Sequence, residues 1–178
     1  MATIEVRKAK VILKARKYSI KEERKIGMDT VLLATRKGKR LIVFCTRPGT
    51  ATVGVSVLRN IKKIMDETKA ERGMIVSHGP LSFSAKNFAR KFNIEVIPRT
   101  LPAFDLIRHE LVPKHRILPP KEVELVLKKY KIELYQMPYI KKDDPIAILL
   151  GARPGDVIEV KRDSPTAGKF TSYRYVVR

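Results

Sequence analysis

Few residues of this chain have the types and spacing that chemistry requires. There is one cysteine, Cys45, and there are three histidines, His78, His109 and His115. A single thiol excludes a disulfide framework and any multi-thiolate metal site. His109 and His115 bracket the sequence HELVPKH, but a spacing of six residues with a proline between them does not place them as neighbours on a helix, so this is not a zinc-protease motif. Cysteine and histidine therefore predict no disulfide and no zinc site, and we expect no metal, no cofactor and no catalytic residue in this chain.

Hydroxyl and basic side chains gather at Ser82-Phe83-Ser84-Ala85-Lys86, where a helix over 84–91 is expected to begin. Hydroxyls at a helix N-terminus suit a phosphate oxygen, although an ordinary serine N-cap explains the same residues. A basic helix is expected from Ile4 to about Lys17. The second candidate is the basic helical stretch from Arg7 to Lys25, which either lies along nucleic acid or is a solvated face. The basic run 36–40 is best explained as the charged tip of a hairpin.

These residues are positioned by an N-terminal part in which strands and helices alternate. Apolar and β-branched runs over 30–35 and 41–46 flank the hairpin signal. Apolar residues at helical spacing predict a helix over 54–69, and short strands are expected at 74–76 and 94–97. Strands alternating with helices predict an α/β domain with some parallel pairing.

The C-terminal part has a different pattern. Pro119-Pro120 opens a helix to about Lys131, while Asp144-Pro145 and Gly151 bound a short helix. Strands over 156–162 and 170–177 flank a loop at 164–168. The overall prediction is an α+β protein with an α/β domain over 1–107 and a small α+β domain over 108–178, ending in a β-hairpin.

Charge separates the two parts further. The 178 residues contain 38 Lys and Arg against 18 Asp and Glu, a net charge of +20. Residues 1–107 hold 23 basic and 9 acidic residues, whereas 108–178 hold 15 and 9. Such an excess favours a polyanionic partner through counterion release. No apolar run is long enough to cross a membrane and no secretory signal is present, so we expect an intracellular protein without membrane contact.

The stretch from Asp29 through the hairpin to Thr46 resembles the core of restriction-endonuclease-like nucleases. In that family an aspartate opens one strand and Glu-x-Lys ends the next, holding Mg²⁺ and orienting water. Aligned on this pattern, Asp29 keeps the aspartate position, but Phe44-Cys45-Thr46 replaces Glu-x-Lys. Phenylalanine cannot ligate a hard cation, so the resemblance implies a nuclease fold without the metal site. We expect Asp29 to be a turn or strand-edge residue and Cys45 to be buried and inert.

HELVPKH resembles the segment that joins the two domains in the fifth-subunit family of cellular RNA polymerases, which has archaeal and eukaryotic members. Asp144-Pro145, Gly151, Pro154-Gly155-Asp156-Val157 and Ser164-Pro165-Thr166-Ala167-Gly168 before Tyr173-Arg174 match that family's assembly domain in order and spacing. The resemblance extends more weakly to a jaw domain through Val43-Phe44-Cys45, Val53-Gly54-Val55 and Ser84-Ala85. In this chain the family's Thr-Pro-Ser-Ala loop reads Ser82-Phe83-Ser84-Ala85.

This resemblance implies a non-catalytic polymerase subunit that docks on the largest subunit and neighbouring core subunits and faces downstream duplex DNA, with no homo-oligomer. The candidate DNA contacts are Arg7, Lys10, Lys14, Arg47, Ser82, Ser84 and Lys86. The candidate subunit-interface residues are His109, Glu110, Pro113, His115, Pro145, Thr166, Gly168, Tyr173 and Arg174. The expected compartment is the cytoplasm of an archaeon, or the nucleus if the source is a eukaryote. Two alternatives stay open, a free-standing basic DNA- or RNA-binding protein and a metal-dependent nuclease.

Overall fold

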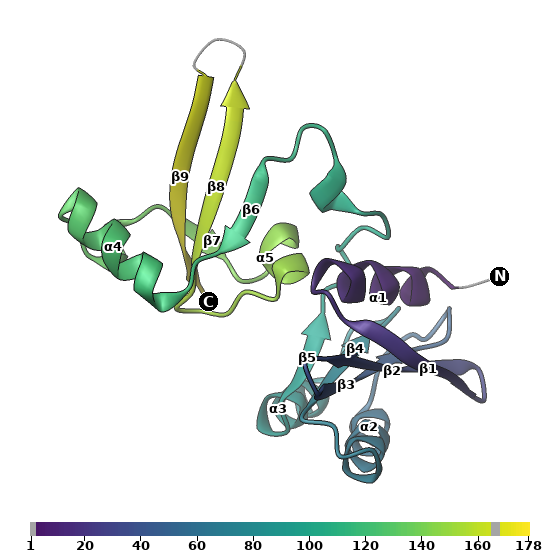
Figure 1. The fold of residues 1–178 in the computed structure, drawn as a ribbon. Helices are drawn as coiled ribbons and strands as arrows, with labels where there is room; N and C mark the ends of the chain where they lie inside the picture. Colours follow the sequence, from purple (N-terminus) through teal and green to yellow (C-terminus); the bar gives the residue numbers. More distant parts are fainter. Residues whose placement is uncertain (1–2, 165–167) are drawn as a thin grey trace. The chain divides into compact units, whose positions relative to one another are not determined.

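The computed structural model describes residues 3–164 and 168–178. The chain divides into two compact units, Met1–Phe104 and Asp105–Arg178, close to the boundary expected from the sequence. Figure 1 shows a sheet with its own helices in each unit. The predicted α+β organisation is confirmed.

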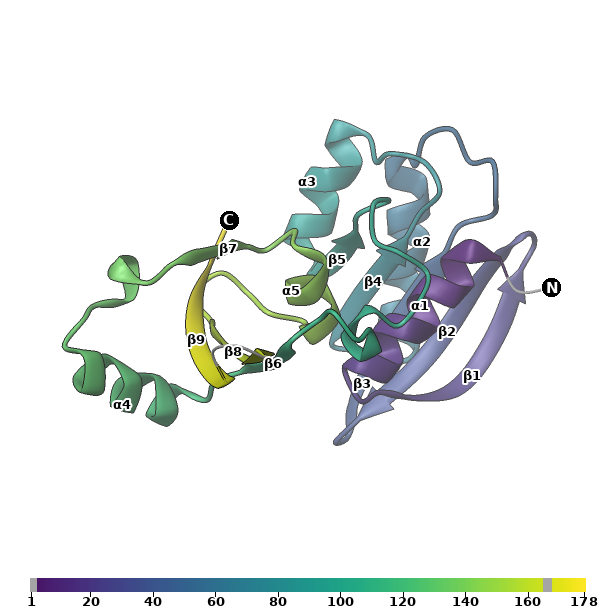
Figure 2. The same cartoon turned by 90° about the horizontal axis from the view of Figure 1, so that it is seen from above.

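The N-terminal unit is built on a five-stranded sheet in the order β1-β2-β3-β4-β5, with β1 at one edge (Figure 2). Its strands are β1 (Ser19–Ile26), β2 (Asp29–Arg36), β3 (Lys39–Cys45), β4 (Arg72–Val76) and β5 (Ile94–Ile97). The first three pair antiparallel, and β3, β4 and β5 pair parallel. Lys37 and Gly38 both have positive φ, as a two-residue hairpin turn requires, so the basic run 36–40 is the hairpin tip that the sequence predicts.

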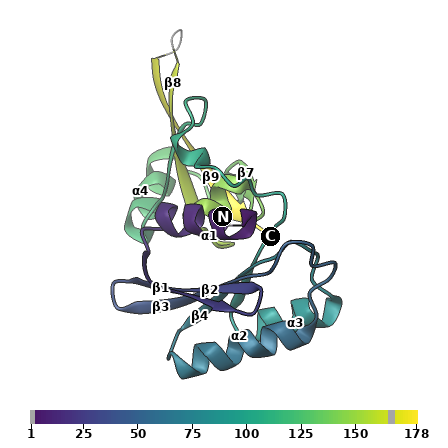
Figure 3. The ribbon, with the colours of Figure 1, turned by 90° about the vertical axis from the view of Figure 1, so that its right-hand side faces the viewer.

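Helices cover both faces of this sheet. Figure 3 shows α1 (Ile4–Ala15) on one face, with α2 (Val55–Glu67) and α3 (Phe83–Lys91) on the other. The core between the sheet and α2 includes Ile42, Phe44 and Ile75. Gly73 permits this close packing, because a Cβ there would lie 2.8 Å from the Met65 sulfur.

One sequence prediction for this unit is wrong. The basic stretch from Arg7 to Lys25 is not a single helix, since α1 ends at Ala15 and residues 19–26 form β1. All eight residues of β1 are exposed. The strand is held by main-chain pairing with β2 at the sheet edge, so it carries no apolar alternation that a sequence pattern could reveal.

The C-terminal unit has a four-stranded sheet in the order β6-β8-β9-β7. The strands are β6 (Lys114–Ile117), β7 (Tyr139–Lys141), β8 (Val157–Ser164) and β9 (Gly168–Val177). The predicted terminal hairpin is present, but its strands reach Ser164 and Gly168, so the connection is shorter than the expected loop 164–168. The two edge strands β6 and β7 were not predicted, because their sequences, KHRI and YIK, contain no apolar run of the kind that marks 74–76 and 94–97. Two short 3₁₀ helices, Leu106–Arg108 and Leu134–Gln136, complete the unit.

Opposite faces of this second sheet are covered by different helices. Helix α4 (Pro120–Tyr130) packs with Val157, Tyr173 and Tyr175, whereas α5 (Pro145–Leu150) packs with the alternate strand positions Ile158, Val160 and Val176. Asp144 caps α5 by accepting from Ile146 N at 2.8 Å, and Gly151 ends it in the left-handed conformation, as the sequence predicts.

An ion pair between exposed Arg116 and buried Glu159 connects β6 to β8 and reaches α4. Arg116 donates to Glu159 through Nε at 2.6 Å and through Nη2 at 3.2 Å, and it also lies 2.8 Å from Glu122 of α4. Glu159 is only 5% exposed, and the hydrogen bonds from Arg116 lower the pKa of its carboxyl. Because both carboxylate oxygens are satisfied, burial of this charge is tolerated in the sheet.

Candidate functional site

The N-terminal unit brings the nuclease-like positions to one edge of its sheet, where β2 begins and β3 and β4 end. Asp29 opens β2, and its carboxylate accepts a hydrogen bond from Arg47 N at 2.7 Å. The expectation of a strand-edge residue is therefore correct. This bond holds the main chain at Arg47, just after β3 ends, so the Asp29 carboxylate already has a structural partner.

The side chains in place of Glu-x-Lys are turned to internal contacts. Phe44 is 4% exposed and packs in the core against α2. The Thr46 hydroxyl accepts from His78 N at 3.0 Å. Cys45 is buried, and this burial raises the pKa of its thiol to about 12, so the thiolate is scarce at neutral pH and the residue is inert, as predicted.

One carboxylate at this edge was missed by the sequence analysis. Glu5 of α1 places Oε1 3.1 Å from His78 Nδ1, while its Oε2 is buried without a hydrogen-bond partner among the described residues. The two residues are 73 positions apart, so no local pattern could pair them. The described residues contain no group of three or more His, Cys, Asp or Glu arranged to hold a metal ion.

The candidate DNA contacts fall into two groups within this unit. Arg7 and Lys14 are exposed on α1, and Lys10 of the same helix pairs with Glu23 at 2.9 Å. Arg47, Ser82, Ser84 and Lys86 lie at the sheet edge described above, where Ser82 N donates to Val53 O at 3.0 Å. Ser82 is the N-cap of α3, accepting from Ala85 N at 3.2 Å. Its hydroxyl thus has the ordinary capping role that the sequence left open.

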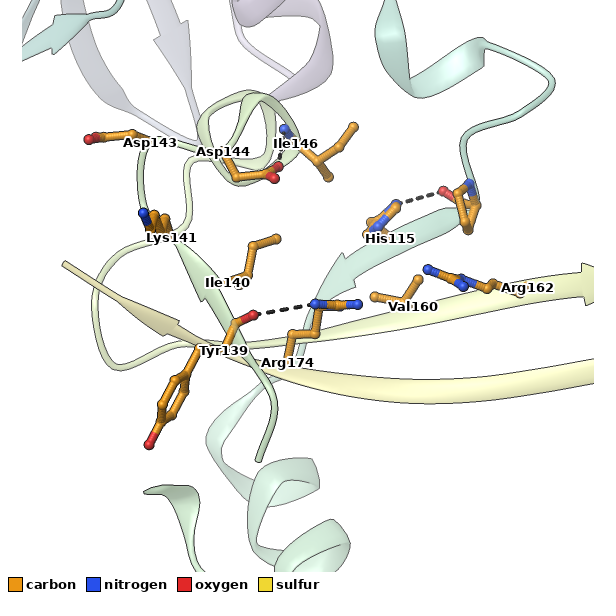
Figure 4. Close-up of a pocket in the computed structure, with 11 residues that line it drawn as sticks. His115, Tyr139, Ile140, Lys141, Asp143, Asp144, Ile146, Val160, Arg162 and Arg174 are labelled. Carbon is orange, nitrogen blue, oxygen red and sulfur yellow. Dashed lines mark hydrogen bonds between the residues drawn. The ribbon is translucent and has the colours of Figure 1, made fainter. Parts of the chain in front are cut away.

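The C-terminal unit contains a cavity of about 540 Å³ (Figure 4). It lies between β6, β7, β8, β9 and the start of α5, and three of the candidate interface residues line it, Pro113, His115 and Arg174. The remaining lining residues are Tyr139, Ile140, Lys141, Asp143, Asp144, Ile146, Val160 and Arg162. Sequence reasoning singled out none of these for partner contact, because they come from β7, the start of α5 and β8, which meet only in the folded unit.

Charge in this cavity is mixed but mostly basic. Arg162 and Arg174 lie on one side of the cavity, while Asp143, Asp144 and Lys141 lie on the other, with Ile140 and Val160 between them (Figure 4). Arg174 Nη1 donates to Tyr139 O at 3.3 Å. Burial lowers the pKa of His115, although the Pro113 carbonyl, 2.6 Å from His115 Nδ1, acts in the opposite direction. The cavity suits a peptide segment with acidic and apolar side chains better than a small reactive substrate.

The other candidate interface residues lie outside this cavity. His109 and Glu110 are exposed in the turn before β6, and Gly168 begins β9 with φ of +67°. Tyr173 packs on the α4 face, with its ring centroid 6.0 Å from that of Tyr130. Pro145 opens α5. Thr166 lies outside the described residues.

Comparison with known families assigns each unit. Residues 104–176 match the family model for the C-terminal domain of RNA polymerase Rpb5, and residues 7–101 match a restriction endonuclease family model. The chain is therefore a polymerase-subunit domain preceded by an endonuclease-like domain. Curated relatives extend this assignment. DNA-directed RNA polymerase subunit Rpo5 of Thermococcus onnurineus is 57% identical over 74 residues, covering 42% of this chain and 90% of that protein. The chain belongs to the Rpb5/Rpo5 family of DNA-directed RNA polymerase subunits.

Two further relatives define how much of the chain is shared. Subunit Rpo5 of Methanocaldococcus jannaschii is 51% identical over 70 residues, covering 39% of this chain and 90% of that protein. The RPABC1 subunit of RNA polymerases I, II and III from Caenorhabditis elegans is 32% identical over 152 residues, covering 83% of this chain and 72% of that protein. An alignment of that length includes parts of both units. The solved apo structure of EndoMS aligns with 54% of this chain and covers 46% of the EndoMS chain. Its sequence identity is 19% and its TM-score is 0.40, so it adds nothing to the assignment.

Proposed function

We propose that this chain is a non-catalytic structural subunit of a multisubunit RNA polymerase. The C-terminal unit docks on the largest subunit and neighbouring core subunits, and the basic N-terminal unit faces downstream duplex DNA. The observation that carries this proposal is the alignment with RPABC1, because one known polymerase subunit matches 83% of the chain.

Docking through the C-terminal unit is supported by the architecture of the archaeal relatives. The 74 residues aligned with the Thermococcus onnurineus protein make up 90% of its length. Because such a segment forms almost the whole of a polymerase subunit, it must contain the contacts that hold it in the complex. In the present chain that segment offers the basic cavity and the protruding hairpin β8–β9.

A DNA-facing role for the N-terminal unit is supported by its charge. Arg7, Lys14, Arg47 and Lys86 form no ion pair with another described residue, so their charges are free for phosphates. Contacts of this kind give affinity that falls with salt and does not depend on sequence. Such weak, sequence-independent contact suits a subunit past which every transcribed sequence has to move.

The absence of catalysis is inferred from what occupies the nuclease positions. Phe44 is part of the core, and Thr46 and Asp29 are engaged with main-chain amides. Replacing Phe44 by a carboxylate to rebuild a metal site would remove its packing against α2. Catalysis by the polymerase would therefore reside in other chains of the complex.

The archaeal relatives are the more similar ones, so we place the chain in an archaeal polymerase, in the cytoplasm. Among the described residues, no helix is long and apolar enough to span a bilayer.

The test is co-purification of the tagged full chain, and of residues 105–178 alone, from native lysate, with the bound proteins identified by mass spectrometry. Both are expected to recover the large polymerase subunits in comparable yield. Recovery by neither would refute the proposal. Tight, salt-sensitive binding of duplex DNA by a chain that recovers no polymerase would instead support a free-standing nucleic-acid-binding protein, which the net charge of +20 also permits.

A further inference from the structure

The two edges of strand β9 are used unequally. On one edge β9 pairs with β8 from Gly168 to Tyr175, and Val176 N also donates to Asp156 O. On the other edge it pairs with β7 only at Tyr175, Val176 and Val177. Within the described chain, no strand covers that second edge from Gly168 to Arg174, where the hairpin extends past its neighbours (Figure 1).

The direction of the main-chain groups follows from two hydrogen bonds. Tyr175 N donates to Pro138 O at 2.9 Å, on the β7 side, and Val176 N donates to Asp156 O at 2.9 Å, on the β8 side. Main-chain groups alternate direction along a strand. Those of Lys169, Thr171 and Tyr173 therefore face the open edge, and those of Ser172 and Arg174 face β8. The described chain offers the first three residues no main-chain partner on that edge.

Side chains along the open edge favour an acidic occupant. From Gly168 to Arg174 the strand carries Lys169 and Arg174 and no acidic residue, and Lys169 lies opposite Asp163 of β8. Phe170 is 59% exposed beside Arg162, its partner across the hairpin. Arg162 and Arg174 both line the cavity of the C-terminal unit, so two of its cations belong to the same hairpin. An extended segment on this edge would place alternate side chains against these cations and the Phe170 ring.

A second copy of the chain is a poor occupant of the same edge. Pairing β9 with β9 would bring Lys169, Arg162 and Arg174 of two chains together, each chain carrying a net charge of +20. Like charges facing each other across strands are destabilising, and lysine on an edge strand discourages self-pairing. The charge therefore selects a different polypeptide.

We propose that the open edge of β9, from Gly168 to Tyr173, binds an extended acidic segment of a partner polypeptide as an added strand. The inference rests on the proposed function, since the partner it requires is another subunit of the polymerase. It names a main-chain mode of attachment that needs the amides of Lys169, Thr171 and Tyr173 rather than particular side chains.

The first test compares Thr171→Pro with Thr171→Ala in the tagged full chain. Proline removes the outward N–H but leaves the bonds to β8, which residue 171 does not make, so the hairpin is expected to fold. Recovery of the large polymerase subunits should fall at least about tenfold for Thr171→Pro and stay unchanged for Thr171→Ala. Equal recovery by both variants would overturn the inference while leaving the proposed function intact. Failure of the unsubstituted chain to recover polymerase would refute the proposed function itself.

The second test needs no substitution. Amide hydrogen exchange at single-residue resolution should be fast for Lys169, Thr171 and Tyr173 in the free chain and slowed at least about tenfold in the polymerase complex, because each amide then gains a partner. Ser172 and Arg174 are built-in controls, bonded to β8 and protected in both states. Unchanged exchange of the three outward amides on assembly would refute strand addition. Their protection in the isolated chain, with dimers in solution, would refute the choice of partner.

Discussion

The edge of the N-terminal sheet and the cavity of the C-terminal unit both contain polar and charged side chains. They differ in how many of these side chains are bonded within their own unit. At the first, Asp29, Thr46 and Glu5 each contact another part of the same domain. At the second, Arg174 and Asp144 are hydrogen-bonded to main-chain groups of the unit, but Arg162, Lys141 and Asp143 line the cavity and form no ion pair with another described residue. A site whose polar groups are bound internally serves the fold, whereas one whose charges stay uncommitted is available to a partner.

The largest expected effect comes from Phe44→Ala. If the former metal position now belongs to the core, truncation should cost about 3–5 kcal/mol of unfolding free energy. Urea denaturation of the full chain measures it. The matched surface control, Phe83→Ala, removes a ring that is 80% exposed and should change stability little. A tolerated Phe44→Ala would mean that this position is not structural, and the contrast between the two regions would fail.

A smaller effect is expected at Glu5. Its buried Oε2 has no hydrogen-bond partner among the described residues, so Glu5→Leu should raise stability by about 1 kcal/mol by removing a buried polar atom that is not satisfied. Glu5→Gln should fall between Leu and the native residue. Thermal unfolding of the three chains gives the order. A loss of stability for Glu5→Leu, together with stabilisation of the native chain but not of the variant by an added divalent cation, would show that the edge still binds an ion.

The stability of the protein should depend on pH through His115, which lines the cavity. Its pKa is lowered by burial, so over the range between the folded-state pKa and the ordinary value near 6.5 the unfolded state binds more protons. Stability is therefore highest above about pH 6.5 and declines as the pH falls below it. Denaturation of the full chain between pH 7.5 and about 5 should show this decline. His115→Gln should flatten it, whereas an unchanged slope would assign the decline to other groups.

The smallest effect concerns DNA. Arg47→Ala should reduce the salt dependence of duplex binding by about one unit of log K against log salt, the amount for one phosphate contact. Fluorescence anisotropy over a salt series measures the slope. Lys142→Ala, which removes an exposed cation from the C-terminal unit, is the control and should leave the slope unchanged. Equal loss in both variants would mean that binding follows total charge rather than the N-terminal unit.

Much of the fold was accessible from sequence because its signals are local. Proline, glycine and capping residues located α4 and α5, and apolar periodicity located α2 and the buried strands. Strand β1 was not predicted, because none of its residues enters the core and only main-chain pairing defines it.

The candidate sites were less accessible, because their members meet only after folding. The loss of the metal site could be foreseen from Phe44 alone, since no environment makes its ring a ligand. The Glu5–His78 contact and the cavity could not, because they depend on which sheet positions face the same side. Motif resemblance pointed to Pro113, His115 and Arg174 without explaining why they lie together.

Strand order in the C-terminal sheet has a consequence for biosynthesis. Strands β6 and β7 are both synthesised before the hairpin β8–β9 to which they attach. The second sheet therefore cannot form until the ribosome has translated residue 177, whereas the first is complete at Ile97. Since domains fold as units during translation, the N-terminal unit should reach its native state on the ribosome while residues 105–156 are still an open chain. The unit that we propose to bind the polymerase is therefore the last to fold.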